Sequence, residues 1–229
     1  PLPADAAALA SLRTAIGARP LFLAASTHPG EDAHVVAAHR AVSAAFPALL
    51  TVVVPRHPER GPAIAAEAAA AGLTVARRAA GDQPGPGTEL YVADTLGELG
   101  LFYRLAGAAL VGGSLVPHGG QNPLEPARLG CPILFGPHMW NFEEPVARLL
   151  AARGAVALDS PAALAPAIGD VLSDPGRARA LAEAAAAVAD GNAGLPGQAA
   201  EALLGLLPPY APAETPAEGR RAGQGTNEG

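Results

Sequence analysis

Residues 108–127 read AALVGGSLVPHGGQNPLEPA and carry the pattern on which the fold prediction rests. The stretch opens with a short run of continuously apolar residues, which is typical of a strand covered by helices on both faces of a parallel sheet. Two glycine pairs and an Asn-Pro step follow, and that step marks the start of a helix. The order of strand, glycine-rich loop and helix is the repeating unit of an α/β fold.

The same unit recurs along most of the chain, because short apolar runs alternate with alanine-rich segments of helical length. Strands are predicted at residues 21–25, 49–55, 73–77, 89–93, 108–112, 132–135 and 155–158. Helices are predicted at residues 32–45, 58–71, 97–105, 123–129, 143–152 and 161–172. Right-handed crossovers between parallel strands then predict a doubly wound, Rossmann-like α/β sheet.

The third and fourth predicted strands are joined by a Gly/Pro-rich loop, residues 79–88, and not by a helix. Toward the C-terminus, Asp174 is predicted to cap a helix over residues 175–189, and a short helix is predicted over 198–207. Residues 208–229 lack apolar periodicity and are predicted to form a disordered tail. The domain is therefore predicted to span residues 1–207, with a tail at 208–229.

The charged residues and the cysteine content exclude several classes of protein. All fifteen basic residues are arginines scattered along a chain of net charge −6, so the concentrated basic surface of a nucleic-acid-binding protein is not predicted. Cys131 is the only cysteine, which excludes an intramolecular disulfide and a cysteine-based zinc site. Neither a metal site nor a cofactor is predicted. No run reaches the ~20 apolar residues of a membrane-spanning helix.

Polar residues gather after the predicted strands, at the edge where ligands bind in doubly wound sheets. Arg56 follows the second strand, and its planar guanidinium suits a phosphate; an ion pair with Glu59 is the alternative. Arg60 is interpreted as a surface charge or a salt-bridge partner. After the first strand, residues 26–31 form either a turn whose amides face an anion or a capping turn with Glu31 in the first helical turn.

Two further loops follow the fourth and fifth strands. Residues 94–99 let the backbone approach a flat ligand and read a base edge, unless they only cap a helix. The loop over 112–122 can wrap a phosphate, with partial positive charge from the following helix, and Asn122 as a plain N-cap is the alternative. Glu125 is placed to accept hydrogen bonds from two ribose hydroxyls. His118 either approaches the ligand or caps its loop.

Several of these motifs, taken in order and spacing, resemble the C-terminal domain of bacterial 3-deoxy-D-manno-octulosonic acid (Kdo) transferases. The resemblance covers about residues 15–170. Its motifs are His28-Pro29-Gly30-Glu31, Pro55-Arg56-His57-Pro58-Glu59-Arg60, Thr95-Leu96-Gly97-Glu98-Leu99, Gly112-Gly113-Ser114 and Asn122-Pro123-Leu124-Glu125-Pro126-Ala127.

The resemblance implies the two-domain GT-B glycosyltransferase architecture, in which the C-terminal half binds the donor CMP-Kdo. It also implies metal-independent transfer with inversion at the anomeric carbon, in one displacement by a hydroxyl of a lipid A precursor. The residues implied to hold the CMP moiety are Pro55, Arg56, Leu96, Gly97, Glu98, Asn122, Pro123, Leu124 and Glu125.

Members of this family carry a further N-terminal domain, implied to bind lipid A, to supply a carboxylate general base and often to hold a membrane anchor. None of that half is recognised in this sequence. We therefore expect no catalytic residue in this chain, and nucleotide binding without sugar transfer. The intact enzyme is expected in the cytoplasm, at the cytoplasmic face of the inner membrane, with peripheral membrane association only through the other half.

Two other functions stay open at this point. A UDP-sugar epimerase-like enzyme shares the architecture and a ribose-binding glutamate, and a preference for uridine over cytidine nucleotides would favour it. A non-catalytic nucleotide-binding module is the second alternative.

Overall fold

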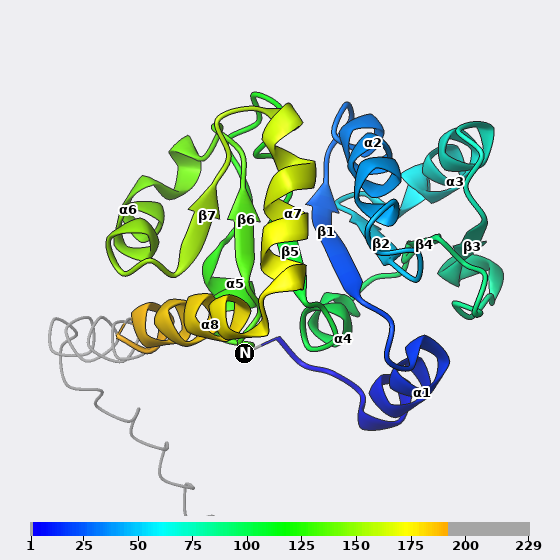
Figure 1. Cartoon of the computed structure of the whole chain (residues 1–229), viewed down its shortest axis with the longest axis horizontal. Helices are drawn as coiled ribbons and strands as arrows, with labels where there is room; N and C mark the ends of the chain where they lie inside the picture. Colours follow the sequence, from blue (N-terminus) through cyan, green and yellow to red (C-terminus); the bar gives the residue numbers. More distant parts are fainter. Residues whose placement is uncertain (1, 192–229) are drawn as a thin grey trace, which may run out of the picture. The chain divides into compact units, whose positions relative to one another are not determined.

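The structure of the protein is a computed structural model that describes residues 2–191. Its strands form one parallel sheet of seven, in the order β3-β4-β2-β1-β5-β6-β7 (Figure 1). The strands are β1 (Leu21–Thr27), β2 (Leu50–Pro55), β3 (Val75–Arg77), β4 (Leu90–Val92), β5 (Ala108–Val111), β6 (Ile133–Phe135) and β7 (Ala155–Ala157). Every predicted strand is present, so the prediction of a parallel α/β sheet is confirmed.

Helices connect most of the strands, together with single-turn 3₁₀ helices. The α-helices are α1 (Ala6–Ile16), α2 (Asp32–Ser43), α3 (Gly61–Ala70), α4 (Leu99–Tyr103), α5 (Leu124–Ala127), α6 (Glu143–Ala151), α7 (Leu164–Ser173) and α8 (Pro175–Asp190). The 3₁₀ helices are η1 (Pro58–Arg60), η2 (Arg78–Ala80), η3 (Trp140–Phe142) and η4 (Pro161–Ala163). The predicted helix at 198–207, the tail at 208–229 and the domain boundary at 207 lie outside the described residues.

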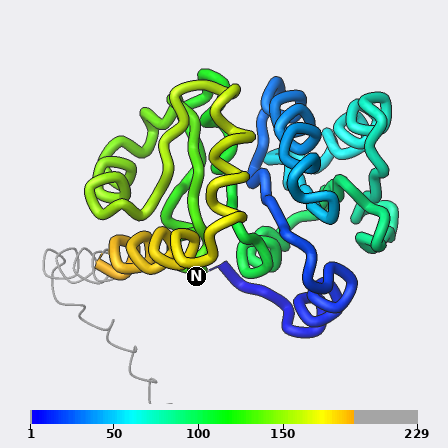
Figure 2. Tube along the Cα trace, viewed as in Figure 1, coloured from blue at the N-terminus to red at the C-terminus, as the bar shows by residue number. Residues whose placement is uncertain are grey.

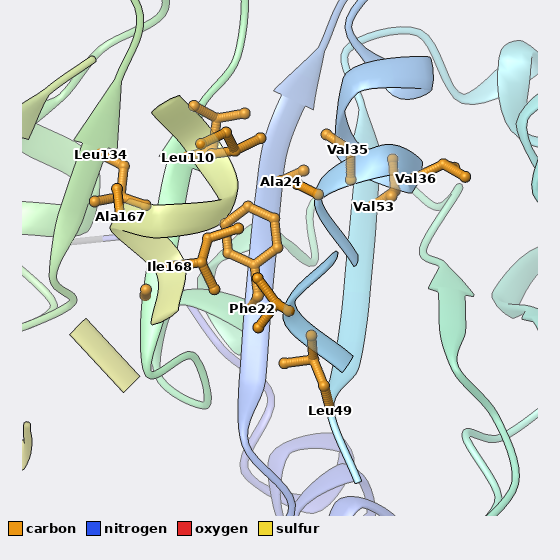
Figure 3. Close-up of a cluster of buried hydrophobic side chains, with 14 of the residues drawn as sticks. Phe22, Ala24, Val35, Val36, Leu49, Val53, Leu110, Leu134, Ala167 and Ile168 are labelled. Atoms are coloured by element: carbon orange, nitrogen blue, oxygen red, sulfur yellow. The ribbon is translucent and has the colours of Figure 1, made fainter. Parts of the chain in front are cut away.

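The sheet is covered on both faces, as its continuously apolar strands predict. Phe22 and Ala24 of β1 pack against α2 and α7, whereas Leu23 and Ala25 belong to the cluster on the opposite face, which includes α1 and α4. Figure 3 shows the Phe22 ring on the face of β1 that α2 and α7 cover, with Ile168 of α7 beside it. All four β1 side chains are buried, and each large one stabilises the fold by roughly 1.5–3 kcal/mol.

Among the described α-helices, α1 is the one that the sequence analysis did not predict. Asp5 caps it, because its carboxylate accepts a hydrogen bond of 2.7 Å from the Ala8 amide, and Leu12 and Ile16 bury its inner face. The i, i+4 spacing of those two residues behind an Asp N-cap is the local signal that would have found it.

The connection between β3 and β4 contains no α-helix, as predicted. Arg19, just before β1, donates hydrogen bonds to the carbonyl oxygens of Ala48 (2.9 Å), Leu49 (3.2 Å) and Gly85 (2.9 Å), and to that of Thr88. One guanidinium therefore ties the β3–β4 loop to the start of the two central strands.

The chain reverses its winding direction at β1. It passes from β1 through α2 to β2 on one side, and later from β4 through α4 to β5 on the other side of β1. In Figure 2 the blue and cyan trace lies mainly on one side of β1, and the green and yellow trace lies mainly on the other. The carboxyl ends of β1 and β5 are therefore the topological switch point, where doubly wound sheets bind ligands.

Candidate functional site

A cavity of about 320 Å³ opens at the carboxyl edge of the sheet. Residues that follow four different strands converge on it: Ser26 at the end of β1, Arg56 after β2, Gly97 after β4, and Gln121 and Glu125 after β5. Its volume is within the range of small-ligand sites. Leu2, Pro3, Leu99 and Gly100 complete the lining.

A larger hollow of about 470 Å³ lies between α2 and η4, but alanines form most of its lining, and it contains no Arg, Asp or Glu side chain. A ligand site needs a few convergent polar groups to fix the ligand's orientation. The cavity at the carboxyl edge is therefore the better candidate, although it is smaller.

Arg56 supplies the positive charge of this cavity. Its backbone amide is fixed by a 3.0 Å hydrogen bond to the Thr27 carbonyl oxygen, at the end of β1. Within residues 2–191 its guanidinium has no ion-pair partner and no hydrogen-bond partner. The alternative pairing with Glu59 is absent there, and the Glu59 carboxylate lies 3.8 Å from the His57 ring instead.

Glu125 places a carboxyl group in the same cavity. Burial raises its pKa above the ordinary value, while Arg128 and Arg56 act in the opposite direction. Its side chain makes no hydrogen bond to the part of the chain that the structure describes. A half-buried carboxyl without a donor is available to accept hydrogen bonds from a ligand.

Of the nine residues predicted to hold CMP, all of which are described, only Arg56, Gly97 and Glu125 line the cavity. Glu98 instead makes a two-pronged contact with Arg78 and accepts from the Thr95 hydroxyl. The Arg78 hydrogen bonds lower the pKa of the Glu98 carboxyl. The Leu96 side chain is 81% exposed.

The remaining predicted residues are Pro55, at the end of β2, and three residues at the start of α5. The Asn122 side-chain oxygen accepts from the Leu124 amide at 3.0 Å, which is the capping role that the sequence left open. Pro55 and Pro123 are buried, and Leu124 packs against the core cluster that includes β6. Helix α5 has only four residues. Pro126 has no amide hydrogen and the Leu124 amide already donates to Asn122, so few amides remain for a phosphate.

Glu31 has a role that the sequence analysis did not predict. Its carboxylate is fully buried and accepts four backbone hydrogen bonds: from His28 (2.8 Å), Gly113 (2.7 Å), Ser114 (3.1 Å) and Leu115 (3.0 Å). Amides of the 26–31 and 112–122 loops that face an anion were one of the alternatives that the sequence left open. Glu31 already satisfies these four amides. Nothing in the local sequence distinguishes this glutamate from one at an ordinary helix start.

Arg60 is a salt-bridge partner, one of its two expected roles. It pairs with Asp32 and donates to the Thr27 carbonyl oxygen at 2.8 Å. Asp32 also accepts from the Thr27 hydroxyl at 2.8 Å. The end of β1 is thereby tied to the starts of α2 and α3.

Histidines support the loop that leads to α5. The rings of His28 and His118 stack with centroids 3.6 Å apart, and His28 Nε2 lies 3.0 Å from the Gln121 side-chain nitrogen. Burial, followed by the charges of His118, His57 and the nearby arginines, lowers the pKa of His28 to about 4. His28 is therefore neutral near pH 7, and its ring accepts a hydrogen bond that directs Gln121 to the cavity.

No protein-family model matches the chain. The chain is 39% identical over 193 residues to the 3-deoxy-D-manno-octulosonic acid transferase of Haemophilus influenzae, a match that covers 84% of this chain and 44% of the relative. The Bordetella pertussis transferase is 41% identical over 190 residues, covering 81% and 44% respectively. The chain therefore spans less than half the length of these curated relatives.

One solved structure is matched over nearly its whole length. The C-terminal CMP-Kdo binding domain of WaaA from Acinetobacter baumannii has a TM-score of 0.76 and 30% identity, over 80% of this chain and 96% of that one. This chain belongs to the Kdo transferase family. The matched structure is the C-terminal domain of such an enzyme, and the match covers 96% of it.

The fold is also shared with a more distant glycosyltransferase. The structure of WaaG, a glycosyltransferase involved in lipopolysaccharide biosynthesis, has a TM-score of 0.55 with 15% identity, which shows the fold alone. The predicted GT-B fold class is confirmed for this chain.

The described part of the chain has two further properties. Among residues 2–191, no helix combines the length and apolar character needed to cross a membrane. Over the same range, no three His, Cys, Asp or Glu side chains are grouped so that they could hold a metal ion.

Proposed function

We propose that this chain is the donor-binding half of a glycosyltransferase that transfers Kdo from CMP-Kdo to a lipid A precursor. The observation that carries the proposal is the convergence of Arg56 and Glu125, a cation and a carboxyl without partners in the described chain, on one cavity. Family membership supplies the identity of the donor. The intact enzyme would act at the cytoplasmic face of the inner membrane.

Each group of the nucleotide has a counterpart in this cavity. The guanidinium of Arg56 suits the phosphate, because its fork of donors fits phosphate oxygens. The Glu125 carboxyl suits the ribose hydroxyls, which are hydrogen-bond donors. Gly97, with a positive φ of 78° and no side chain, lets the backbone of residues 96–98 approach the base.

The transfer reaction places a demand on these residues. A lipid A hydroxyl oxygen forms a bond to the anomeric carbon of Kdo while the bond from that carbon to the phosphate oxygen breaks. CMP departs with the electron pair, and the hydroxyl proton passes to the carboxylate base that the family resemblance assigns to the N-terminal half. Negative charge grows on the phosphate as the bond breaks. A cation such as Arg56 beside the departing phosphate stabilises that charge in the transition state. We assign no general base to the described residues.

Calorimetric titration of the 229-residue chain with CMP, cytidine and UMP tests donor binding. We expect CMP to bind more tightly than cytidine or UMP. Arg56→Gln should weaken CMP about tenfold and leave cytidine unchanged, since it removes a charge-assisted contact to the phosphate. Glu125→Gln should weaken both CMP and cytidine but not 2′,3′-dideoxy-CMP. Arg40→Gln, in the last turn of α2, is the matched control.

The outcomes separate the alternatives. Absence of CMP binding by folded protein would contradict the proposal, and tighter binding of UMP or UDP-N-acetylglucosamine would favour an epimerase-like enzyme. Transfer itself can be measured in a chimera in which this chain replaces the matching 44% of the Bordetella pertussis relative. CMP binding without transfer by that chimera would favour a non-catalytic binding module.

A further inference from the structure

Ser26 has a backbone conformation that is unusual for its residue type. Its φ is +56°, in the left-handed region that costs a non-glycine residue roughly 1–2 kcal/mol. It forms a bulge one residue before the end of β1, because the β1–β2 register shifts between Ala25 and Thr27. Bulges at sheet edges redirect side chains and often lie beside functional sites.

Arg153 is the other non-glycine residue with positive φ, at +57°, among residues 2–191. It directly follows Ala152, the C-cap of α6, and its amide bonds to the Leu150 carbonyl oxygen at 3.0 Å. A left-handed residue after a helix end is a common way to satisfy the last carbonyls. Ser26 lies within a strand and not after a helix, so this explanation does not apply to it.

Both neighbouring strands hold Ser26 in place. On one side the Gly112 amide donates to the Ala25 carbonyl oxygen at 2.8 Å, and on the other the Arg56 amide donates to the Thr27 carbonyl oxygen at 3.0 Å. A Cβ atom at Gly112 would lie 2.2 Å from the Ser26 carbonyl oxygen. The glycine at the start of the β5 loop is therefore required by the bulge.

The bulge brings Ser26 to the wall of the cavity, which Arg56 and Gln121 also line. The side chain is partly exposed, and its hydroxyl makes no hydrogen bond to residues 2–191. Sites that keep a strained residue commonly use it in binding or catalysis. Here the strained residue carries a hydroxyl without a partner in the described chain, and it lines the same cavity as Arg56.

We propose that Ser26 is a donor-binding residue whose hydroxyl donates a hydrogen bond to a phosphate oxygen of the nucleotide that Arg56 also contacts. This rests on the proposed function of the cavity. The bulged conformation is retained because it points the hydroxyl at that oxygen. The strained backbone at Ser26 therefore lowers the stability of the fold, and the hydrogen bond to the phosphate raises the affinity for the nucleotide.

The test combines calorimetry and thermal unfolding of the 229-residue chain with Ser26→Ala, Ser26→Gly and Arg153→Gly. Ser26→Ala and Ser26→Gly should each weaken CMP about tenfold, since they remove one hydrogen bond to a charged group, and should leave cytidine unchanged. Ser26→Gly and Arg153→Gly should raise the unfolding midpoint by ~2 °C, because glycine adopts positive φ without strain. Arg153→Gly should bind CMP like the parent chain.

Equal CMP affinity in the parent chain and Ser26→Ala would overturn this inference while leaving the proposed function intact. A similar loss of cytidine affinity in Ser26→Ala would also overturn it, because the effect would then not involve the phosphate. Failure of the parent chain to bind CMP would overturn both proposals.

Discussion

Two glutamates lie at the same edge of the sheet, and their surroundings differ. Glu31 is fully buried and accepts four backbone hydrogen bonds from two loops. Glu125 is only partly buried and has no donor among the described residues. A buried polar group that finds its partners within the chain stabilises the fold, whereas one that lacks them is available to a ligand. The same contrast separates Arg60, which is paired, from Arg56.

The largest effect that distinguishes the two glutamates is on stability. In Glu31→Gln an amide nitrogen replaces one oxygen and faces two backbone donors, so we expect a loss of about 3 kcal/mol in the free energy of unfolding. Glu125→Gln should change it by less than about 0.5 kcal/mol. Urea unfolding of both variants measures the difference. Similar values for the two variants would contradict the distinction.

The two arginines should divide in the same way with a smaller effect. Arg60→Gln removes the Asp32 ion pair and one bond to the Thr27 carbonyl oxygen, so we expect a loss of roughly 1–2 kcal/mol in the free energy of unfolding. Arg56→Gln should leave that free energy nearly unchanged, and its expected defect is in CMP binding. Urea unfolding beside CMP titration checks both; a stability loss from Arg56→Gln as large as that from Arg60→Gln would argue against an unpartnered Arg56.

His28 predicts a pH dependence. Its pKa falls from 6.5 to about 4 on folding, so between these values the unfolded chain binds more protons and stability is lost as pH decreases. Replacing it by Gln should flatten the stability profile over that window. Urea unfolding at several pH values tests this, and an unchanged slope in His28→Gln would show that other groups cause the pH dependence.

Glu125 predicts a weaker trend of opposite sign. Burial raises its pKa above 4.5, so just above that pH the folded chain binds more protons, and the stability that this group contributes is lost as pH rises through the raised pKa. The free energy of unfolding of the parent chain, compared with that of Glu125→Gln, should therefore increase as pH falls toward 4.5. Parallel curves for the two proteins would mean that the carboxyl is solvated.

The sequence by itself determined the strands, the parallel sheet and the loops that share its carboxyl edge, because continuously apolar runs such as residues 108–111 report burial on both faces. It also led to the correct family through the order of its loop motifs. Helix α1 escaped prediction although Asp5 and the Leu12/Ile16 spacing indicate it.

Only the tertiary structure decided which polar residues remain available. Glu98 contacts Arg78, Asn122 caps α5, and the partners of Glu31 in the β5 loop lie 82 to 84 residues away along the chain. Periodicity and capping are local properties that can be seen in a short window. Whether a carboxylate is satisfied depends instead on which distant loops the sheet brings together, and that is settled only when the chain has folded.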